Sequence, residues 1–438
     1  MVSSNAQTLV YNLKISSVGP GWATDSEAVH EPNSIDLAMK LHYLKSVYFF
    51  CSEACQGLTI SCLKESMFYW LNDYYITCGR FRRNDAGRPY LKCNDCGIRM
   101  IEAECDTSLD EWLELKDSSL NDMLVYHLPI GPELSFSPPV YFQATKFKCG
   151  GLSFGLSWAH ILGDPFSASY YMNMLSPFLA GVRSNRPVKV TKQPKTLGKS
   201  ENIKAPPLSL KRVDPVGDHW VTANNCKMQT FSLYLTASQV SHLLSNMWGQ
   251  SPNKETPLFE SLCAIIWQCI AKVREGHDPK IVTICKKDPT NPENEILSNN
   301  QIISSAKADF SIIDSNLKKL AMLLVDGAID ERDQIDETVE NNDGSLDYIV
   351  YGANLTFINL ENANSYELEL NGFKPKFVYH TIQGVGDEGA VLLFPWPEYC
   401  DKYDDKGRVV TIISPEKEVI KLKSELKKIG LILESDIE

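Results

Sequence analysis

The most informative stretch of the chain is Ser157-Trp158-Ala159-His160-Ile161-Leu162-Gly163-Asp164. The apolar and small residues of Leu152–Trp158 predict a buried strand, which would run directly into His160. Asp164 follows four residues later. Histidine is the side chain best suited to accept a proton near neutral pH, and a hydroxyl or amine that attacks a thioester needs such a base. The spacing makes His160 a candidate general base and Asp164 a residue that orients the loop or the ring.

The same spacing has a plainer interpretation. An H-x-x-x-D pattern occurs by chance in many proteins, and a histidine at the end of a strand is more often structural than catalytic. For Asp164 the structural role is the stronger expectation. The remaining histidines, His42, His127 and His380 among them, show no partner in the sequence and are expected to be surface or satisfied residues.

Composition limits the classes of protein that the chain can belong to. A length of 438 residues suggests two or three domains, and a formal charge of −12 argues against broad binding to nucleic acid or anionic membranes, although a local basic patch stays open. The first ten residues do not read as a signal peptide, and no apolar run is long enough for a transmembrane helix. The 13 cysteines are scattered, and Cys93 and Cys96 form the one C-x-x-C pair, so we expect reduced thiols and no metal.

Strand and helix patterns alternate in both halves of the chain, which predicts an α/β or α+β fold. Prolines and lysines crowd Asn185–Leu210, where large apolar residues are few. The expected organisation is an N-terminal domain at 1–188, a linker or crossover at 189–215, and a C-terminal domain at 216–438. Other predicted elements are helices at Ile60–Leu71 and Phe259–Val273, strands at Val140–Phe147 and Tyr348–Leu360, and a turn at Cys149–Gly151.

Several separated segments, in the right order, give the chain a resemblance to the BAHD acyltransferases. The segments are Ser34–Leu37 with Val47–Phe50, Gly79–Phe81 with Cys93–Gly97, Pro139–Gly151 leading to His160, and Pro257–Trp267. The resemblance implies two chloramphenicol-acetyltransferase-like domains, each a mixed sheet flanked by helices, with a channel between them. It also implies acyl-CoA as co-substrate without a permanently bound cofactor, His160 as general base, and a structural Asp164.

The chain departs from the family's second signature, Asp-Phe-Gly-Trp-Gly. The matching residues are Val350-Tyr351-Gly352-Ala353-Asn354, which keep the central glycine and lack the aspartate and the tryptophan. The arginine that pairs with that aspartate in the family is missing from Ile284–Lys287, and losing both partners avoids a lone buried charge. We expect Gly352 to serve the backbone. Trp158, Tyr351 and Asn354 are candidates for a channel or oxyanion contact.

This combination is similar to the eceriferum/glossy branch of the family, which Asp36–Tyr43, Leu156–Asp164 and Tyr351–Phe357 resemble. The branch implies a plant protein of very-long-chain fatty acid elongation for cuticular wax. It implies a monomer that is peripheral on the cytosolic face of the endoplasmic reticulum, or otherwise cytoplasmic. The implied partners are the elongase condensing enzyme, a ketoacyl-CoA synthase, and long-chain acyl-CoA.

Two main hypotheses follow, and they differ in class. The chain is an accessory of the elongase that shifts product length, or it is an acyl-CoA-dependent O- or N-acyltransferase that uses His160. The rebuilt second signature favours the first, and the retained His160 and Asp164 favour the second. A module that binds acyl-CoA without turnover is a third, weaker reading.

Overall fold

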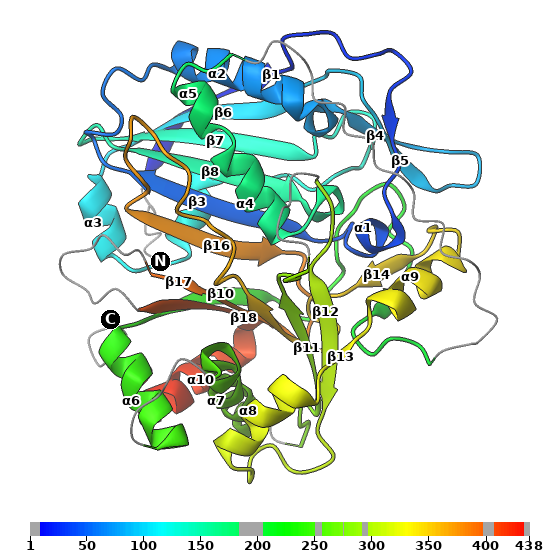
Figure 1. Ribbon diagram of the computed structural model, residues 1–438, viewed down its shortest axis with the longest axis vertical. Coiled ribbons are helices and arrows are strands. Elements are labelled where there is room, and N and C mark those ends of the chain that lie inside the picture. Colours follow the sequence, from blue (N-terminus) through cyan, green and yellow to red (C-terminus); the bar gives the residue numbers. More distant parts are fainter. Residues whose placement is uncertain are drawn as a thin grey trace, which may run out of the picture.

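Two mixed sheets organise the protein, one above the other in Figure 1. The computed structural model describes residues 9–183, 205–249, 256–274, 276–290, 297–396 and 407–432. In the first sheet the strand order is β1-β6-β7-β8-β3-β16, and in the second it is β10-β18-β17-β15-β11-β12-β13. The predicted α/β class with a mixed sheet in each half is confirmed.

The first sheet has six strands, of which β6 and β7 are parallel and the other neighbours antiparallel. Every residue of β3 and β8 is buried, as the apolar and aromatic runs require for strands covered on both faces. The predicted turn at Cys149–Gly151 joins β7 to β8, with Gly150 at φ +88°. The strands are β1 (Val10–Val18), β6 (Ile98–Cys105), β7 (Val140–Phe147), β8 (Leu152–Ala159), β3 (Tyr43–Phe50) and β16 (Phe377–Gln383).

The second sheet has seven strands and includes the parallel pairs β11–β15 and β15–β17. Its strands are β10 (Met228–Leu235), β18 (Arg408–Pro415), β17 (Ala390–Pro395), β15 (Leu355–Asn359), β11 (Ile281–Lys286), β12 (Ile302–Lys307) and β13 (Ile329–Asp330). Short strands form two small sheets: β2 (Val29–His30) with β5 (Pro89–Lys92) and β4 (Arg80–Arg83), and β9 (Lys211–Val213) with β14 (Asp347–Ile349).

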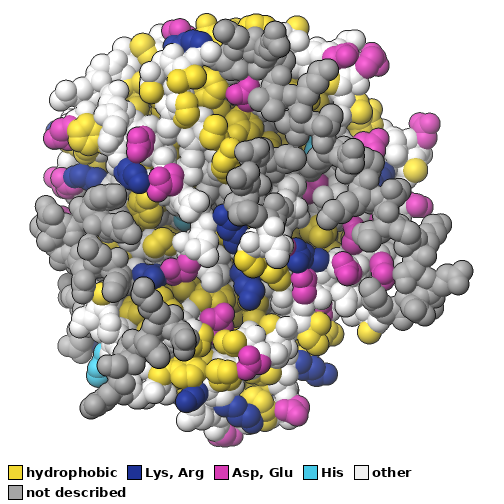
Figure 2. Space-filling model, viewed as in Figure 1, with side chains coloured by type: hydrophobic (Ala, Val, Ile, Leu, Met, Phe, Trp, Pro, Cys, Tyr) yellow, Lys and Arg dark blue, Asp and Glu magenta, His cyan; other side chains and the backbone are white. Residues whose placement is uncertain are grey.

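Helices cover the outer faces of both sheets (Figure 1). The predicted helix at Phe259–Val273 is α7 (Leu258–Val273). Its strongly apolar sequence, which includes Trp267, is buried under the second sheet. Over the first sheet lie α2 (Ile60–Asp73), α4 (Pro165–Asn173) and α5 (Ser176–Leu179), with α3 (Leu109–Glu114) at one side; under the second lie α6 (Ala237–Trp248), α7 (Leu258–Val273), α8 (Leu317–Asp326) and α10 (Glu416–Lys428). The short helices α1 (Ser34–Ala38) and α9 (Arg332–Glu340) pack against each other. Charged side chains of both signs are interspersed on the face that Figure 2 shows.

The prediction of one continuous strand over Tyr348–Leu360 is wrong. The chain forms β14, turns, and resumes as β15. The turn is enforced at Gly352, whose φ is +82° and whose Cα lies so near Gly386 that a Cβ would sit 2.4 Å from the Gly386 nitrogen. The expected backbone role of Gly352 is thus a turn that interrupts the strand, and the close approach of Gly386 leaves no room for a side chain there.

The first sheet takes its last strand from the second half of the chain. Residues Phe377–Gln383 form β16 and pair antiparallel with β3, from Phe377 opposite Phe49 to Gln383 opposite Tyr43. The domain boundaries 1–188, 189–215 and 216–438 therefore stay a prediction, because β16 of the second half of the chain completes the sheet of the first half. Much of the expected linker lies outside the described residues, and within its described part Lys211–Val213 forms β9.

A buried ion pair joins the two halves beside α1. Lys40 Nζ lies 2.6 Å from Asp347 Oδ1 and donates to the Leu346 carbonyl at 3.2 Å. Both charged side chains are almost completely buried, and Asp347 Oδ2 also accepts from the Val216 backbone N–H. Such a pair is costly to break because the remaining charge stays buried without a partner.

We expect Lys40→Met to lower the free energy of unfolding by about 3–5 kcal/mol, since it strands the Asp347 carboxylate. The double variant Lys40→Met/Asp347→Asn should recover much of that loss. Urea unfolding of both variants measures this. Lys227→Met is the control, because Lys227 pairs with Glu416 on the surface and should cost less than about 1 kcal/mol. Equal losses for Lys40→Met and the control would show that the buried pair contributes nothing special.

Candidate active site

His160 stands where strand β8 ends and a single 3₁₀ turn, His160–Leu162, begins. Its backbone is held from two sides: its N–H donates to the His42 carbonyl at 3.0 Å, and its carbonyl accepts from Asn299 Nδ2 at 2.9 Å. His42 follows α1, and Asn299 precedes β12. The first and second halves of the chain thus fix this backbone together.

The imidazole of His160 belongs to a hydrogen-bonded chain of three side chains, His160, Tyr351 and Gln301. His160 Nε2 is 2.9 Å from Tyr351 Oη, which in turn accepts from Gln301 Nε2 at 2.8 Å. The Tyr351 hydroxyl also lies 3.2 Å from Gln301 Oε1, so its proton has two acceptors within reach, the amide oxygen and His160 Nε2. In either arrangement Nε2 is engaged by the tyrosine hydroxyl, and Nδ1 has no hydrogen-bond partner among the residues described.

All three side chains are buried, and burial decides their charge. Removal from water lowers the pKa of His160 to about 4, so the ring is neutral at pH 7. Burial also raises the pKa of Tyr351, so its hydroxyl keeps its proton. A neutral histidine can accept a proton, but one whose pKa is about 4 is a weaker base than catalysis near pH 7 favours.

The Asp164 side chain points away from the imidazole and binds backbone. One carboxylate oxygen caps α4 by accepting from the Ser167 N–H at 2.9 Å, and the other accepts from the N–H groups of Asn300 and Gln301 at 2.8 and 2.9 Å. Pro165 occupies the first turn of α4, where a missing N–H costs nothing. Burial raises the pKa of Asp164, and these hydrogen bonds oppose that shift.

Asp36 and Asn299 belong to the site, and the sequence reasoning missed them. Asp36 forms a capping box with Asn33 at the start of α1. Asp36 Oδ1 also accepts from the backbone N–H of Asn299 at 3.1 Å and from its Nδ2 at 2.9 Å, the same atom that reaches the His160 carbonyl. The two residues are 263 positions apart, so no local spacing could have paired them.

His42 is a satisfied buried residue, as expected of the histidines without a visible partner. Its Nδ1 donates to the Gly384 carbonyl at 2.9 Å, and its Nε2 accepts from the backbone N–H groups of Val350 and Tyr351 at 3.1 and 3.2 Å. Burial lowers the pKa of His42 to about 3. A neutral His42 thereby fixes the backbone that presents Tyr351 to His160.

The structure does not gather all the residues named as channel or oxyanion candidates. Tyr351 contacts His160 directly. Trp158 uses its one N–H on the Gly163 carbonyl at 3.0 Å, and its ring packs on Tyr171. Asn354 is half-buried and donates to the Leu208 carbonyl at 2.6 Å. Its amide therefore holds the backbone segment that leads into the second half of the chain.

The departure from the family's second signature leaves an apolar core. Val350 and Cys285 are both completely buried within one hydrophobic cluster that reaches from the first sheet into the second half. Neutral side chains at both positions avoid an unpaired buried charge, as the joint loss predicts.

Nothing in the described ranges points to a resident metal, since no cluster of three or more His, Cys, Asp or Glu is arranged to hold one. Among the same residues, no helix combines the length and apolar character that crossing a bilayer demands.

The two mixed sheets, with His160 directly after a strand of the first, give the chain a chloramphenicol-acetyltransferase-like architecture. The Transferase family matches residues 33–286. Protein ECERIFERUM 26 of Arabidopsis thaliana is 42% identical over 423 residues, 97% of this chain and 96% of the relative. Protein ECERIFERUM 2 of the same plant is 36% identical over 95% of this chain and 98% of its own length. The chain belongs to the BAHD transferase family, in its eceriferum branch.

Solved structures share the fold. Vinorine synthase has a TM-score of 0.68 at 16% identity, with coverage of 96% of this chain and 98% of that one. TRI101 of F. graminearum, complexed with coenzyme A and deoxynivalenol, has a TM-score of 0.66 at 14% identity and covers 92% and 100%. At such identities the likeness concerns the fold alone.

Buried neutral histidines predict a characteristic dependence of stability on pH. His380 lies between Ser46 and Ser365, and burial lowers its pKa to about 3, against about 6.5 in an unfolded chain. Below pH 6.5 the unfolded chain therefore takes up a proton that the folded protein refuses. Stability is full above pH 6.5 and falls on acidification by about 1.4 kcal/mol per pH unit for each such histidine.

Urea unfolding between pH 7.5 and pH 5 should show a shallower loss of stability for His380→Asn than for the wild type. Asparagine keeps polar atoms between the two serines and does not titrate. His219→Asn, at an exposed position, is the control and should follow the wild type. Identical pH slopes for wild type and His380→Asn would contradict a neutral buried His380.

Proposed function

We propose that this chain acts in very-long-chain fatty acid elongation for cuticular wax, as a partner of the elongase condensing enzyme, a ketoacyl-CoA synthase. One observation carries the proposal: the Nε2 atom that a general base would use is bound by Tyr351 Oη at 2.9 Å inside a fully buried site. The eceriferum relatives supply the link to wax by their name. The proposed location is the cytosolic face of the endoplasmic reticulum, where that elongase would be met.

A long-chain acyl-CoA is the proposed ligand. TRI101, which shares the fold, is known in a complex with coenzyme A. A partner of a condensing enzyme would hold the growing acyl chain or its thioester without cleaving it, and so shift the length at which elongation ends. The role needs the shape of the protein and does not need a free base at His160.

The alternative is an active acyl-CoA-dependent O- or N-acyltransferase. A neutral His160 and a firmly held Asp164 favour it. In that reaction His160 Nε2 takes the acceptor's proton while the acceptor oxygen or nitrogen attacks the thioester carbonyl. The carbon–sulfur bond then breaks, and coenzyme A leaves as a thiol with the proton from His160. Tyr351 would first have to leave Nε2.

Co-expression in yeast with a plant ketoacyl-CoA synthase tests the accessory role, with acyl lengths measured by gas chromatography. We expect longer acyl chains with the wild type and equally with His160→Ala, since the side chain of His160 binds only inside the core. His219→Ala, at an exposed position, controls for the substitution itself, and protein levels are checked for all three. Longer acyl chains with the wild type and His219→Ala, but not with His160→Ala, would favour the acyltransferase alternative.

Purified protein and a long-chain acyl-CoA test whether the Tyr351 hydroxyl prevents His160 Nε2 from acting as a base. The wild type should release no coenzyme A above the buffer rate, as measured with a thiol reagent. Tyr351→Phe removes the capping hydroxyl and should release it at least tenfold faster, at a cost in stability of about 1–3 kcal/mol because Gln301 loses its partner. Tyr351→Phe/His160→Ala should return to the buffer rate. If Tyr351→Phe released coenzyme A no faster than the wild type, the Tyr351 hydroxyl would not be what prevents His160 from acting as a base.

A further inference from the structure

A basic hollow lies at the surface, lined by residues of β6 in the first sheet and of β4 in the small sheet β2-β5-β4. It has a volume of about 330 Å³ and is lined by Arg80, Arg82, Asn94, Cys96, Arg99, Ser135 and Phe136. Three of these side chains are arginines, and none of the described residues that line the hollow is acidic. In a chain whose formal charge is −12, this is a local reversal of sign.

The arginines of the hollow are not neutralised within the part of the chain that the structure describes. Arg80 is buried and gives its N–H groups to carbonyls, including those of Gly79 at 2.7 Å and Gly97 at 3.0 Å. Arg82 donates to the Phe81 carbonyl, and Arg99 donates to Ser17 Oγ. Each of these acceptors is neutral, so the positive charge is available to an anion from outside. Guanidinium groups suit phosphate because they offer several N–H donors in one plane.

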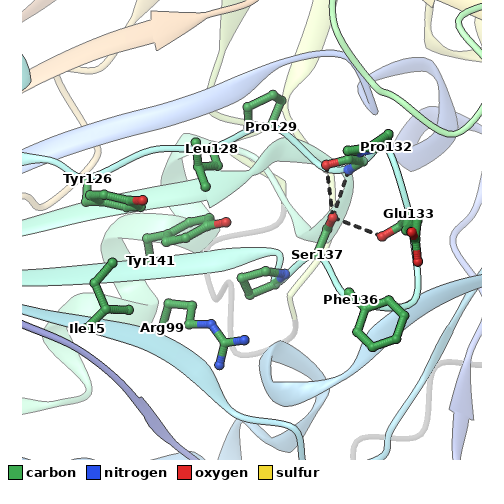
Figure 3. Close-up of a pocket in the computed structure, with 12 residues that line it drawn as sticks. Ile15, Arg99, Tyr126, Leu128, Pro129, Pro132, Glu133, Phe136, Ser137 and Tyr141 are labelled. Carbon is green, nitrogen blue, oxygen red and sulfur yellow. Dashed lines mark hydrogen bonds between the residues drawn. The ribbon is translucent and has the colours of Figure 1, made fainter.

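An apolar hollow of about 640 Å³ adjoins the basic one and shares Arg99 and Phe136 with it. Figure 3 shows Tyr126, Tyr141 and Ile15 along one side, with Phe136 on the opposite loop. Glu133 is the one acidic residue of its lining and lies across the hollow from Arg99. A positive hollow beside an apolar one matches an amphipathic anion.

Three apolar side chains at this rim protrude into solvent. Phe136 is 72% exposed, Ile15 56% and Leu128 51%. The loop that carries Phe136 is fixed in place: the Ile130 N–H donates to Tyr43 Oη at 2.8 Å, and Ser137 Oγ accepts from the Gly131 N–H at 2.9 Å. A small soluble anion would leave these side chains in water, whereas a bilayer would bury them.

We propose that this surface, defined by Arg82, Arg99, Ile15, Leu128 and Phe136, docks on an anionic phospholipid bilayer. A headgroup phosphate enters the arginine hollow, and the protruding apolar side chains enter the boundary between headgroups and acyl chains. The acidic remainder of the protein is repelled by such a bilayer, so contact is restricted to this face. The inference deepens the proposed peripheral location and is independent of the elongation role, because it needs no condensing enzyme.

Vesicle flotation with the purified full chain tests the inference. Vesicles of phosphatidylcholine alone are compared with vesicles of phosphatidylcholine and phosphatidic acid. We expect the wild type to float with the anionic vesicles only. Arg82→Gln/Arg99→Gln should lower the partition coefficient at least tenfold, since each basic side chain near an anionic surface contributes about a fivefold factor. Phe136→Ser, at an exposed position that leaves the fold alone, should also weaken binding severalfold.

Two matched controls lie elsewhere on the surface. Arg212→Gln removes an exposed arginine of β9, and Ile420→Ser removes an isoleucine of α10 that is 81% exposed. Both should float as the wild type does. Equal flotation of wild type, Phe136→Ser and the arginine double variant would overturn the proposal, as would equal binding to uncharged vesicles. Displacement from the vesicles by millimolar glycerol phosphate would overturn the bilayer in favour of a soluble phosphate ligand.

Discussion

Two buried carboxylates hold the halves of this protein together, and the site depends on them. Asp36 and Asp164 both come from the first half, and both are satisfied by the segment 299–301 of the second, through its backbone N–H groups and one side-chain amide. A buried carboxylate without such donors would be costly, so the segment has little freedom to lie elsewhere. Asn299 and Gln301 are thereby carried to His160 and Tyr351.

The same segment explains how the imidazole of His160 comes to be engaged in the core. Gln301 donates its backbone N–H to the carboxylate of Asp164 and its side-chain amide N–H to the hydroxyl oxygen of Tyr351. Tyr351 is aimed from the other side by neutral His42, which binds its backbone N–H. His160 is therefore enclosed by residues that each have a second, structural engagement.

Sequence reasoning could predict what is local and could not predict what is brought together. The strand that ends at Ala159, the turn at Cys149–Gly151 and the helix at Leu258–Val273 follow from periodicity and turn chemistry. The family likeness added the two-sheet fold and named Tyr351 as a candidate for a channel or oxyanion contact, but it did not predict the hydrogen bond between Tyr351 and His160. The roles of Asp36 and Asn299 at the site stayed hidden, because the two residues are 263 positions apart in the sequence and no local pattern pairs them.

The retained H-x-x-x-D motif can thus be understood without catalysis. Its aspartate caps α4 and binds segment 299–301, and the backbone of its histidine anchors His42 and Asn299. The histidine ring completes the hydrogen-bonded chain that runs through Tyr351 to Gln301. Each of these tasks depends on folding alone and would persist after acyl transfer had been lost. The side chains of Val350 and Cys285, in the two stretches where the chain departs from the family, are by contrast apolar fillers of the core.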